Sequence, residues 1–340
     1  MYNEPENEGY VWSLSSGHTL RIGTDCSGID APVQAVKNIG IPFRHVFSCD
    51  LDKWCMQVIQ QNSPPERMLQ MDMRERDVDS VPDVDLYVCG FPCQPFSIRG
   101  KREGMQDKRG NVFFACVEYI RRKRPTFFLL ENVPLLVTLE GGETFRVIME
   151  ELNAIGGYVV EWAKMDTKDY GIPQRRRRIY ILGRRDGGGK VLPPNLIPCS
   201  PQDVFVDWSN REPPPPCGNQ TERARVLTTH ILRGGGCFLD TQQYRVPQRV
   251  PRDTTFSSCL ITSTTLWCAK LERWASVKEL LRLQGFPDDF IPLKSDSKMK
   301  KLVGNTMSVN VLESILSPLL LGVDCAGSFL PYNVSRVLRQ

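Results

Sequence analysis

Residues 20–30, LRIGTDCSGID, contain the turn on which the fold depends. The first five are typical of a strand, Ser27 and Gly28 predict a tight turn, and Pro32 suits the first turn of a helix that follows Asp30. A strand, a turn and a helix in this order begin a βαβ unit. The segment therefore predicts an α/β fold with a mostly parallel, twisted sheet, in which ligands bind beyond the carboxyl ends of the strands.

The same alternation continues through the first two thirds of the chain. Further strands are expected over residues 43–49, 84–89, 126–130, 158–165 and 178–182, with a short one before Asp72. Helices are expected after Asp52, whose carboxylate can cap the first turn, and over residues 111–123, 143–155, 277–283 and 308–320. Such an alternation is typical of a parallel sheet covered by helices.

The composition changes after Arg185. Three consecutive glycines precede a proline-rich stretch, which excludes a helix there, and residues 211–252 hold seven Arg, no Lys and three acidic residues. We therefore expect a small irregular domain over residues 186–275, with strand-like sequence at 254–267, inserted between a main α/β body (21–185) and returning helices (276–325). Residues 1–20 are expected to form an N-terminal extension, for which disorder is one interpretation, and residues 326–340 a C-terminal tail.

Composition excludes several classes of protein. Hydrophobic residues make up 41% of the 340 residues and charged residues 24%, which is typical of a soluble globular protein. No apolar run approaches the roughly 18 residues of a membrane-spanning helix, and the first twenty residues contain no Lys or Arg, unlike a secretory signal. The twelve cysteines include no C-x-x-C pair, so no zinc site is expected. We also expect a reduced, intracellular protein.

Polar residues at three predicted strand ends suit an adenosyl ligand. The Ser27-Gly28 turn alone is also compatible with an ordinary βα turn, because it lacks the G-x-G-x-x-G pattern. Asp50, about 20 residues further on, can accept hydrogen bonds from ribose hydroxyls. A helix cap is the alternative for Asp50, although Asp52 suits that role better. Asp72 could accept from an adenine amino group, but the pattern does not specify which adenosyl compound binds.

A cysteine with unusual surroundings follows the strand predicted at 84–89. Residues 90–97, GFPCQPFS, hold Cys93 between two prolines, and residues 97–109 contain five basic and two acidic side chains. Cations lower the pKa of a nearby thiol and raise its thiolate fraction, so Cys93 is a candidate nucleophile. An incidental thiol in a proline-rich turn is the alternative interpretation.

Two further motifs supply an acid and cations. Glu131 follows a strongly apolar strand, where partial desolvation raises a carboxyl pKa toward the range of a proton donor. A structural Glu paired with an arginine is equally compatible with this pattern. In QRRRR, residues 174–178, strand alternation points Arg176 and Arg178 to one side and Arg175 and Arg177 to the other. A solvated basic turn is the usual alternative for such a run.

Together these motifs resemble the DNA (cytosine-5) methyltransferases of the bacterial restriction-modification type. The resemblance covers residues 21–320, and the motifs stand in that family's usual order: 24–30, 47–52, 70–73, 90–97, 107–114, 131–133, 174–178, 282–290 (RLQGFPDDF) and 304–309 (GNTMSV). It implies a Rossmann-like class I methyltransferase domain that uses S-adenosyl-L-methionine, with the activity of the EC 2.1.1.37 class, and double-stranded DNA as the partner of an inserted target-recognition domain. A monomer without a metal is expected, in the bacterial cytoplasm or, for a virus-encoded enzyme, inside the infected cell.

The resemblance also implies roles for individual residues. Cys93 would add to carbon 6 of a flipped-out cytosine, Glu131 would give a proton to N3, and Arg176 and Arg178 would hold the base and the catalytic loop. The cofactor pocket would be lined by Cys26, Ser27, Gly28, Ile29, Asp50, Leu51, Asp72, Met73, Gly90, Pro92, Val112, Asn305 and Thr306. DNA contacts are expected from Gln94, Ser97, Arg99, Lys101, Arg102 and Arg109 in the loop and from Arg233 and Arg245 in the inserted domain.

The chain departs from the family's pattern in the cofactor region. Cys26 stands where Phe is usual, Asp30-Ala31 replaces a Gly-Gly pair, and Leu51 occupies a position that is often aromatic. These departures concern cofactor affinity rather than the chemistry at Cys93.

Two other functions are compatible with parts of the pattern. One branch of the family modifies tRNA and resembles S-P-P-C-Q-P-F-T around the nucleophile, with a later Cys-Phe-Thr, whereas this chain has GFPCQPFS and no Cys-Phe-Thr. A non-catalytic DNA-binding homologue should have lost the nucleophile or the acid, and this chain keeps both. Amino-methylating DNA enzymes resemble D-P-P-Y, which is absent here.

Overall fold

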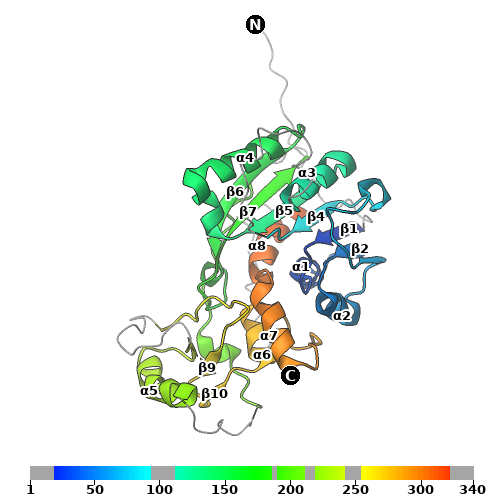
Figure 1. Cartoon of the computed structure of the whole chain (residues 1–340). Coiled ribbons are helices and arrows are strands. Elements are labelled where there is room, and N and C mark those ends of the chain that lie inside the picture. The colour runs from blue at the N-terminus through cyan, green and yellow to red at the C-terminus, as the bar shows by residue number, and fades with distance from the viewer. Residues whose placement is uncertain (1–18, 93–111, 186–189, 211–218, 242–253, 322–340) are drawn as a thin grey trace.

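A seven-stranded sheet forms the centre of the larger part of the molecule (Figure 1). The computed structural model describes residues 19–92, 112–185, 190–210, 219–241 and 254–321. The strand order is β3-β2-β1-β4-β5-β7-β6, with β1 (Leu20–Asp25), β2 (Phe43–Cys49), β3 (Arg67–Leu69), β4 (Leu86–Cys89), β5 (Phe127–Asn132), β6 (Val159–Asp166) and β7 (Arg177–Arg184). β1 to β5 pair in parallel, whereas β7 is antiparallel to both β5 and β6. The predicted α/β fold with a mostly parallel sheet is confirmed.

Helices cover both faces of this sheet, as a sheet with buried parallel strands requires. The core on one face includes α1 (Ala31–Ile39), α2 (Lys53–Asn62) and α8 (Val309–Leu321). The core on the other face includes α3 (Val112–Lys123) and α4 (Glu143–Asn153). α8 packs against α1 (Figure 1), so helices from the beginning and the end of the described chain lie in the same layer.

Local sequence explains where several helices begin and end. The Asp52 carboxylate accepts from the Trp54 amide at 2.8 Å and caps α2, as predicted. Pro32 occupies the first turn of α1, and Gly40 ends that helix with a φ of 82°, a conformation that favours glycine. Ser276 begins α6 (Val277–Leu283) with a capping box.

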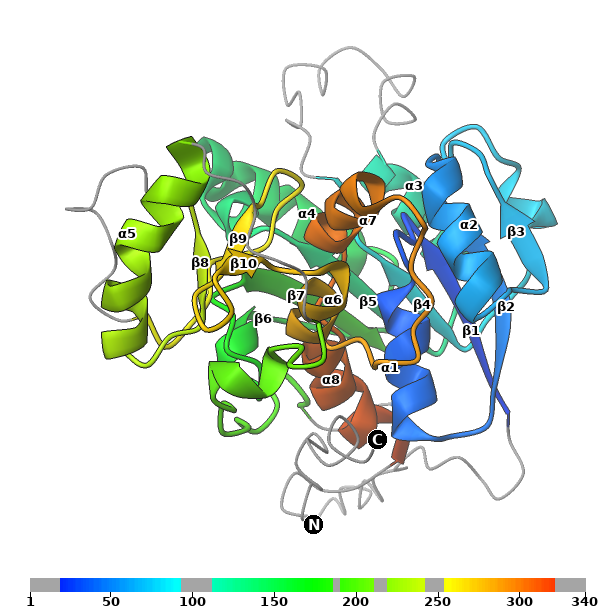
Figure 2. The same ribbon diagram turned by 90° about the horizontal axis from the view of Figure 1, so that it is seen from below.

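A second, three-stranded sheet belongs to the segment between β7 and α6. Its order is β10-β9-β8, with β8 (Phe238–Asp240), β9 (Leu266–Cys268) and β10 (Arg273–Trp274), and it shares a small core with α5 (Asn219–Arg233). Figures 1 and 2 show this small unit beside α6, next to the large sheet. The domain boundaries expected from the sequence stay a prediction.

Two features of the small unit differ from the sequence-based expectation. The strand-like sequence at 254–267 forms a strand only from Leu266, because residues 254–265 are turns and irregular chain. The fifteen-residue helix α5 is not among the predicted helices. Its buried residues Ala224, Leu227 and Ile231 have helical spacing, which the surrounding arginines obscure.

A buried ion pair joins the small sheet to α6. Arg273 on β10 and Glu279 on α6 are both buried, and Arg273 Nη1 lies 2.8 Å from Glu279 Oε2. The Glu279 carboxylate also accepts from the amides of Asp207 and Ser276, each at 2.8 Å. A carboxylate with this many fixed donors holds the small unit in one orientation on the returning helices.

The last of the returning helices, α8, reaches the large sheet. α7 (Asp296–Asn305) follows α6 and contacts it, and α8 follows directly. α7 is not predicted as a helix from the sequence, although its last residues belong to the 304–309 motif. In the described part of the chain, no helix has the length and apolar character needed to cross a membrane.

Candidate functional site

The residues predicted to bind the cofactor gather at one edge of the large sheet. β1, β2 and β4 are adjacent parallel strands, so the segments that follow them emerge at the same edge. Cys26 to Ile29 follow β1, Asp50 and Leu51 follow β2, and Gly90 to Pro92 follow β4. The fold thus brings together three of the motifs that carry the cofactor prediction.

Ser27 attaches the turn after β1 to the end of β2. Its hydroxyl donates to the main-chain carbonyl of Cys49 at 3.1 Å and accepts from the Cys49 amide at 3.0 Å. The Gly28 amide donates to Asp50, 2.9 Å from Oδ2. Cys26 and Gly28 have positive φ angles of 48° and 57°, so the chain turns sharply here. Burial raises the pKa of Asp50 in spite of its amide donors.

The other predicted cofactor residues near β2 and β3 have different surroundings. Leu51 has 66% of its surface exposed and presents apolar area at the rim of the site. Asp72 lies beyond the end of β3, and the Arg74 guanidinium, 2.9 Å from Oδ1, holds the Asp72 pKa below its usual range. Met73 is buried, and Val112 is half-buried at the first position of α3.

The end of α7 approaches the end of β4. A Cβ added to Gly90 would lie 2.8 Å from Met307 Cε and 3.7 Å from Glu131 Oε2. The absence of a side chain at Gly90 therefore lets both residues come close to the main chain of β4. Asn305 is exposed and Thr306 is buried beside this contact, so the predicted cofactor residues of the last motif lie next to those of β4.

Asn132 fixes the beginning of the segment that carries the predicted nucleophile. It is buried at the last position of β5, and its Nδ2 donates to the main-chain carbonyl of Phe91 at 2.8 Å. Its Oδ1 accepts from the Val133 amide at 2.8 Å, which defines the orientation of the side-chain amide. Cys93 itself lies outside the described residues, but the chain leading to it is held beside Glu131.

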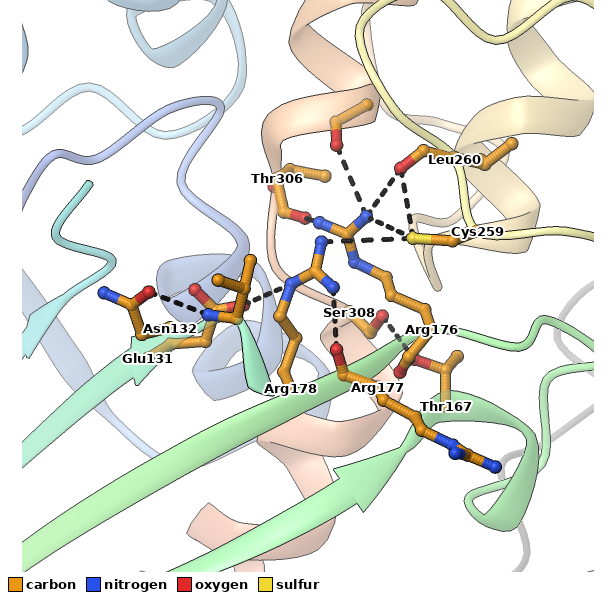
Figure 3. A network of polar contacts seen from close by, with 12 residues as sticks. Glu131, Asn132, Thr167, Arg176, Arg177, Arg178, Cys259, Leu260, Thr306 and Ser308 are labelled. Carbon is orange, nitrogen blue, oxygen red and sulfur yellow. Dashed lines mark hydrogen bonds and ion pairs between the residues drawn. The ribbon is translucent and has the colours of Figure 1, made fainter. Parts of the chain in front are cut away.

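Glu131 and Arg178 form an ion pair at the carboxyl end of β5 (Figure 3). Arg178 Nε lies 3.0 Å from Glu131 Oε1, and the two side chains are only 14% and 12% exposed. Tyr180 is the direct partner of Glu131 in the β5–β7 pairing, so Arg178, two residues earlier, is on the same face of β7. Burial raises the pKa of Glu131, and the attraction of Arg178 and Arg176 opposes this rise without cancelling it.

Arg176 has a different environment from Arg178. Its guanidinium is buried and donates to the main-chain carbonyls of Leu260 at 2.7 Å, Gly304 at 3.3 Å and Thr306 at 2.5 Å (Figure 3). These acceptors belong to the small unit, to the end of α7 and to the residue after it. Arg176 therefore joins three segments whose relative positions shape the site, whereas Arg178 is the arginine that contacts Glu131.

The remaining arginines of the QRRRR motif lie elsewhere. Arg177 points away from Arg178 in Figure 3 and pairs with Asp166, with Nε 3.2 Å from Oδ2. Arg175 lies over the ring of Phe256, 5.3 Å from its centroid. Arg176 and Arg178 both approach Cys259 Sγ while Arg177 points away, as the predicted alternation requires for these three residues.

Most of the predicted DNA-binding residues lie outside the described part of the chain. These residues are Gln94, Ser97, Arg99, Lys101, Arg102, Arg109 and Arg245. The nucleophile candidate Cys93 also lies outside the described residues. Of the DNA-binding set, only Arg233 is described, and it is exposed at the end of α5. Pro92, the last described residue before Cys93, is also exposed.

The family of the chain follows from a sequence profile. The profile of the family described as C-5 cytosine-specific DNA methylase matches residues 24–203 and 240–320. The chain belongs to this family. The matched ranges include the turn after β1, the ends of β2, β4 and β5, and the Arg176 and Arg178 positions of this methylase.

Curated relatives of the methylase include two type II methyltransferases. M.NgoBI of Neisseria gonorrhoeae is 33% identical over 281 residues, which are 79% of this chain and 84% of the relative. M.HaeII of Haemophilus aegyptius is 31% identical over 303 residues, which are 83% of this chain and 88% of the relative.

Solved structures with a similar fold include two methyltransferases. A putative DNA modification methyltransferase encoded within a prophage (E. coli) gives a TM-score of 0.63 at 19% identity, covering 88% of this chain and 98% of the other. The Dnmt2 methyltransferase of S. pombe also gives 0.63, at 18% identity, covering 89% and 98%. At these identities the likeness concerns the fold, which for this methylase is the Rossmann-like methyltransferase fold.

Several residues of this candidate site are not among those predicted individually. Gln174 is buried, accepts from the Leu260 amide at 2.9 Å and donates to the Leu283 carbonyl at 2.6 Å. Asn132 and Gln174 both stand inside motifs that the sequence singles out, which is a signal that could have identified them. Cys259, 3.5 Å from Arg176 Nη1, has no such signal. The described residues contain no group of His, Cys, Asp and Glu side chains that could hold a metal ion.

Proposed function

We propose that this methylase transfers a methyl group from S-adenosyl-L-methionine to carbon 5 of a cytosine in double-stranded DNA, through a transient bond between Cys93 and carbon 6. Carbon 5 of cytosine is a poor nucleophile on its own. Addition of a thiolate to carbon 6, together with a proton at N3, converts the ring into an enamine whose carbon 5 can attack an electrophilic methyl group. Loss of the carbon 5 proton then expels the cysteine and restores the aromatic ring.

The observation that carries this proposal is the buried pair of Glu131 and Arg178. A carboxyl group whose pKa is raised by burial keeps its proton to higher pH than an ordinary glutamate and can donate it to a ring nitrogen. Arg178, 3.0 Å away, supplies a fixed cation for the electron-rich ring that forms when the thiolate adds. Asn132, which holds the Phe91 carbonyl, keeps the described chain that leads to Cys93 beside this acid. We assign these roles to Glu131 and Arg178 and a positioning role to Arg176.

The turn after β1 fits the cofactor. Its main chain has positive φ at Cys26 and Gly28, as well as at Asp30 where the turn ends, and leaves the Gly28 amide and the Asp50 carboxylate at the edge of the sheet. An acidic side chain at the end of the second strand suits ribose hydroxyls, and the exposed Leu51 offers an apolar surface to the adenine. These residues would hold S-adenosyl-L-methionine, which supplies the methyl group as an electrophile when it is bound.

The DNA substrate is supported by the family and by the names of the curated relatives, which are type II methyltransferases. A stacked base cannot reach Glu131, so the cytosine must leave the helix, at a cost of about a few kcal/mol. We expect the loop that carries Arg99, Lys101 and Arg102 to contact the DNA, and the small unit with Arg233 to select the target sequence.

A methyl-transfer assay tests this proposal. The purified chain is incubated with S-adenosyl-L-methionine labelled in the methyl group and with a mixed pool of duplex DNA, and in parallel with tRNA. We expect label in the DNA, and bisulfite sequencing should locate it at cytosine within one recurring sequence. Cys93→Ser should remove the transfer and leave DNA binding largely intact. Duplexes that carry 5-fluorocytosine at the target should form a covalent complex, because fluorine cannot leave as a proton does.

Two results would overturn the proposal. Label in tRNA but not in any duplex would assign the chain to RNA modification. Near-normal transfer by Cys93→Ser would show that another group is the nucleophile.

A further inference from the structure

Asp30 occupies a strained main-chain position at the end of the proposed cofactor turn. Its φ of 61° lies in the left-handed region, which costs free energy for any residue with a Cβ and which glycine adopts readily. The family's usual pattern has glycine at this position, so this chain carries a departure that needs compensation. The Asp30 amide also donates to the Ser27 carbonyl at 2.8 Å, which ties the strained residue directly to the turn.

A set of buried polar contacts stabilises the Asp30 carboxylate. Oδ1 accepts from the Thr24 hydroxyl at 2.9 Å, and Oδ2 accepts from the Ser48 hydroxyl. His45 Nε2 lies 3.3 Å from Oδ2, and the side chains of Asp30 and His45 are each only 4% exposed. Thr24 and Ser48 are direct partners in the parallel pairing of β1 and β2, so the sheet places both donors beneath the turn.

His45 is arranged to carry two protons. Its Nδ1 lies 2.6 Å from the main-chain carbonyl of Ser63, which can only accept, so Nδ1 is a donor. Its Nε2 faces the Asp30 carboxylate and the Ser48 hydroxyl, 2.6 Å away. Since Ser48 donates its proton to Asp30, Nε2 is also a donor. Burial lowers the pKa of His45, but the charge and hydrogen bond of Asp30, together with the Ser63 carbonyl and the charge of Glu66, raise it overall.

Loss of the proton from His45 would remove two donors from Asp30. A neutral imidazole that keeps the proton on Nδ1 has a lone pair on Nε2, and the Ser48 hydroxyl would turn to donate to it. Asp30 would then retain only the Thr24 hydroxyl among these three side chains. Thr24 Oγ1 also lies 2.7 Å from Ser27 Oγ, so the same set of contacts joins Asp30 to the residue that attaches the turn to β2.

In the described part of the chain, Glu66 interacts electrostatically with His45, and Cys55 and Asp50 interact with Asp30. Glu66 precedes β3, and its amide donates to the His45 carbonyl. Its carboxylate lies 2.7 Å from Arg44 Nε, on the same strand as His45. From α2, the thiol of Cys55 stays protonated, because burial and nearby carboxylates raise its pKa well above neutral. Asp50 also has a charge interaction with Asp30, and its carboxylate accepts from the Gly28 amide.

We propose that Asp30 and His45 form a positioning pair for the cofactor turn, and that cofactor affinity falls as His45 loses its proton. The inference rests on the proposed function, because it assumes that the turn holds S-adenosyl-L-methionine. Asp30 and His45 are positioning residues rather than catalytic ones, so they should change cofactor binding and leave the chemical step with bound cofactor unchanged.

The proposed role of Asp30 and His45 is tested by measuring, with calorimetry, the dissociation constant of S-adenosylhomocysteine, the demethylated product, from about pH 6 to pH 9. For the unmodified chain we expect the dissociation constant to rise with pH. His45→Gln should weaken binding by roughly tenfold at the acidic end, the loss expected for a charge-assisted hydrogen bond, and should remove the pH dependence. His230→Gln is the matched control, because His230 is exposed on α5, and it should bind as the unmodified chain does.

Two substitutions of Asp30 separate strain from charge. Asp30→Gly suits the positive φ and should keep binding within about threefold at neutral pH, but without pH dependence. Asp30→Ala keeps the strain without the carboxylate and should bind less tightly than Asp30→Gly. This rescue by glycine would not be expected if Asp30 only filled space in the core.

Proton NMR of the histidine rings provides a measurement that needs no cofactor. The chain has three histidines, so the His45 signal is identified by its loss in His45→Gln. In the unmodified chain it should titrate at higher pH than in Asp30→Gly.

The outcomes are distinguishable. If the unmodified chain binds no S-adenosylhomocysteine at any pH, the proposed function and this inference both fail. If it binds, but with the same affinity and pH dependence in His45→Gln, the inference alone is overturned. An unchanged His45 titration in Asp30→Gly would also overturn it.

Discussion

Arg178 on β7 holds the Glu131 carboxylate on β5 at a distance of 3.0 Å. The two effects on this carboxyl group have opposite signs, since burial favours its protonated form and the guanidinium favours its charged form. Burial is the larger effect, so the group keeps a raised pKa while it remains fixed in one orientation. That combination suits an acid that gives a proton to a base and takes it back within one turnover.

Glu131→Gln should lower kcat by about 100- to 10,000-fold, because the amide keeps the shape but has no acidic proton to give. Duplex binding should change little, since the acid acts only on the flipped base. Single-turnover methyl transfer and a DNA-binding titration measure the two quantities separately. A kcat within threefold of the unmodified enzyme would remove Glu131 from the mechanism.

The pH dependence of methyl transfer should report the same group. The acid must be protonated, so kcat should fall as pH rises through the raised pKa of Glu131, on the alkaline side of the usual range for a glutamate. Arg178→Ala should move this fall to higher pH, because Arg178 lowers the pKa of Glu131. Profiles of kcat against pH, measured for the unmodified chain and for Arg178→Ala at saturating DNA and cofactor, show in which direction the fall moves. A shift to lower pH would contradict the assignment.

Much of this arrangement could be predicted from the sequence because it depends on local patterns. The strand and turn of residues 20–30, the cap at Asp52 and the alternation of Arg176 and Arg178 all follow from spacing along the chain. The mostly parallel sheet follows from the alternation of strands and helices. The antiparallel direction of β7, between β5 and β6, does not, because strand sequence carries little information about direction.

The contacts that could not be predicted join residues far apart in the chain. Arg176 donates to Leu260 and Thr306, which are 84 and 130 residues away. Sequence spacing places Arg176 on one face of a strand but cannot show that its partners are main-chain carbonyls. In the same way, Asp30 is visible as a departure from the family's pattern, whereas its partner His45 appears only when β1 and β2 pair.

Arg176→Lys should destabilise the fold more than it changes the chemistry. A lysine cannot reach three carbonyls in different directions, and a buried carbonyl left without a donor costs about 1–3 kcal/mol. We expect a loss of roughly 2 kcal/mol in the free energy of unfolding, measured by urea denaturation. Arg177→Lys is the control, because the Arg177 side chain is 70% exposed and bonds only to Asp166 among the contacts described above. Equal stability of the two variants would show that Arg176 does not join the segments it contacts.

Asn132→Asp should slow methyl transfer without weakening the binding of DNA or of the cofactor. The new carboxylate would face the Phe91 carbonyl with no proton to donate, so the segment leading to Cys93 would move away from Glu131. Displacements of about 1 Å in such sites cost on the order of 100-fold in rate. Single-turnover rates at saturating DNA measure this loss, and equilibrium binding of duplex and of S-adenosylhomocysteine should stay within about threefold. Asn153→Asp is the control, because Asn153 donates to the Met149 carbonyl in the same way at 2.8 Å but is exposed at the end of α4. If both variants react at the unmodified rate, the Phe91 contact does not position the nucleophile.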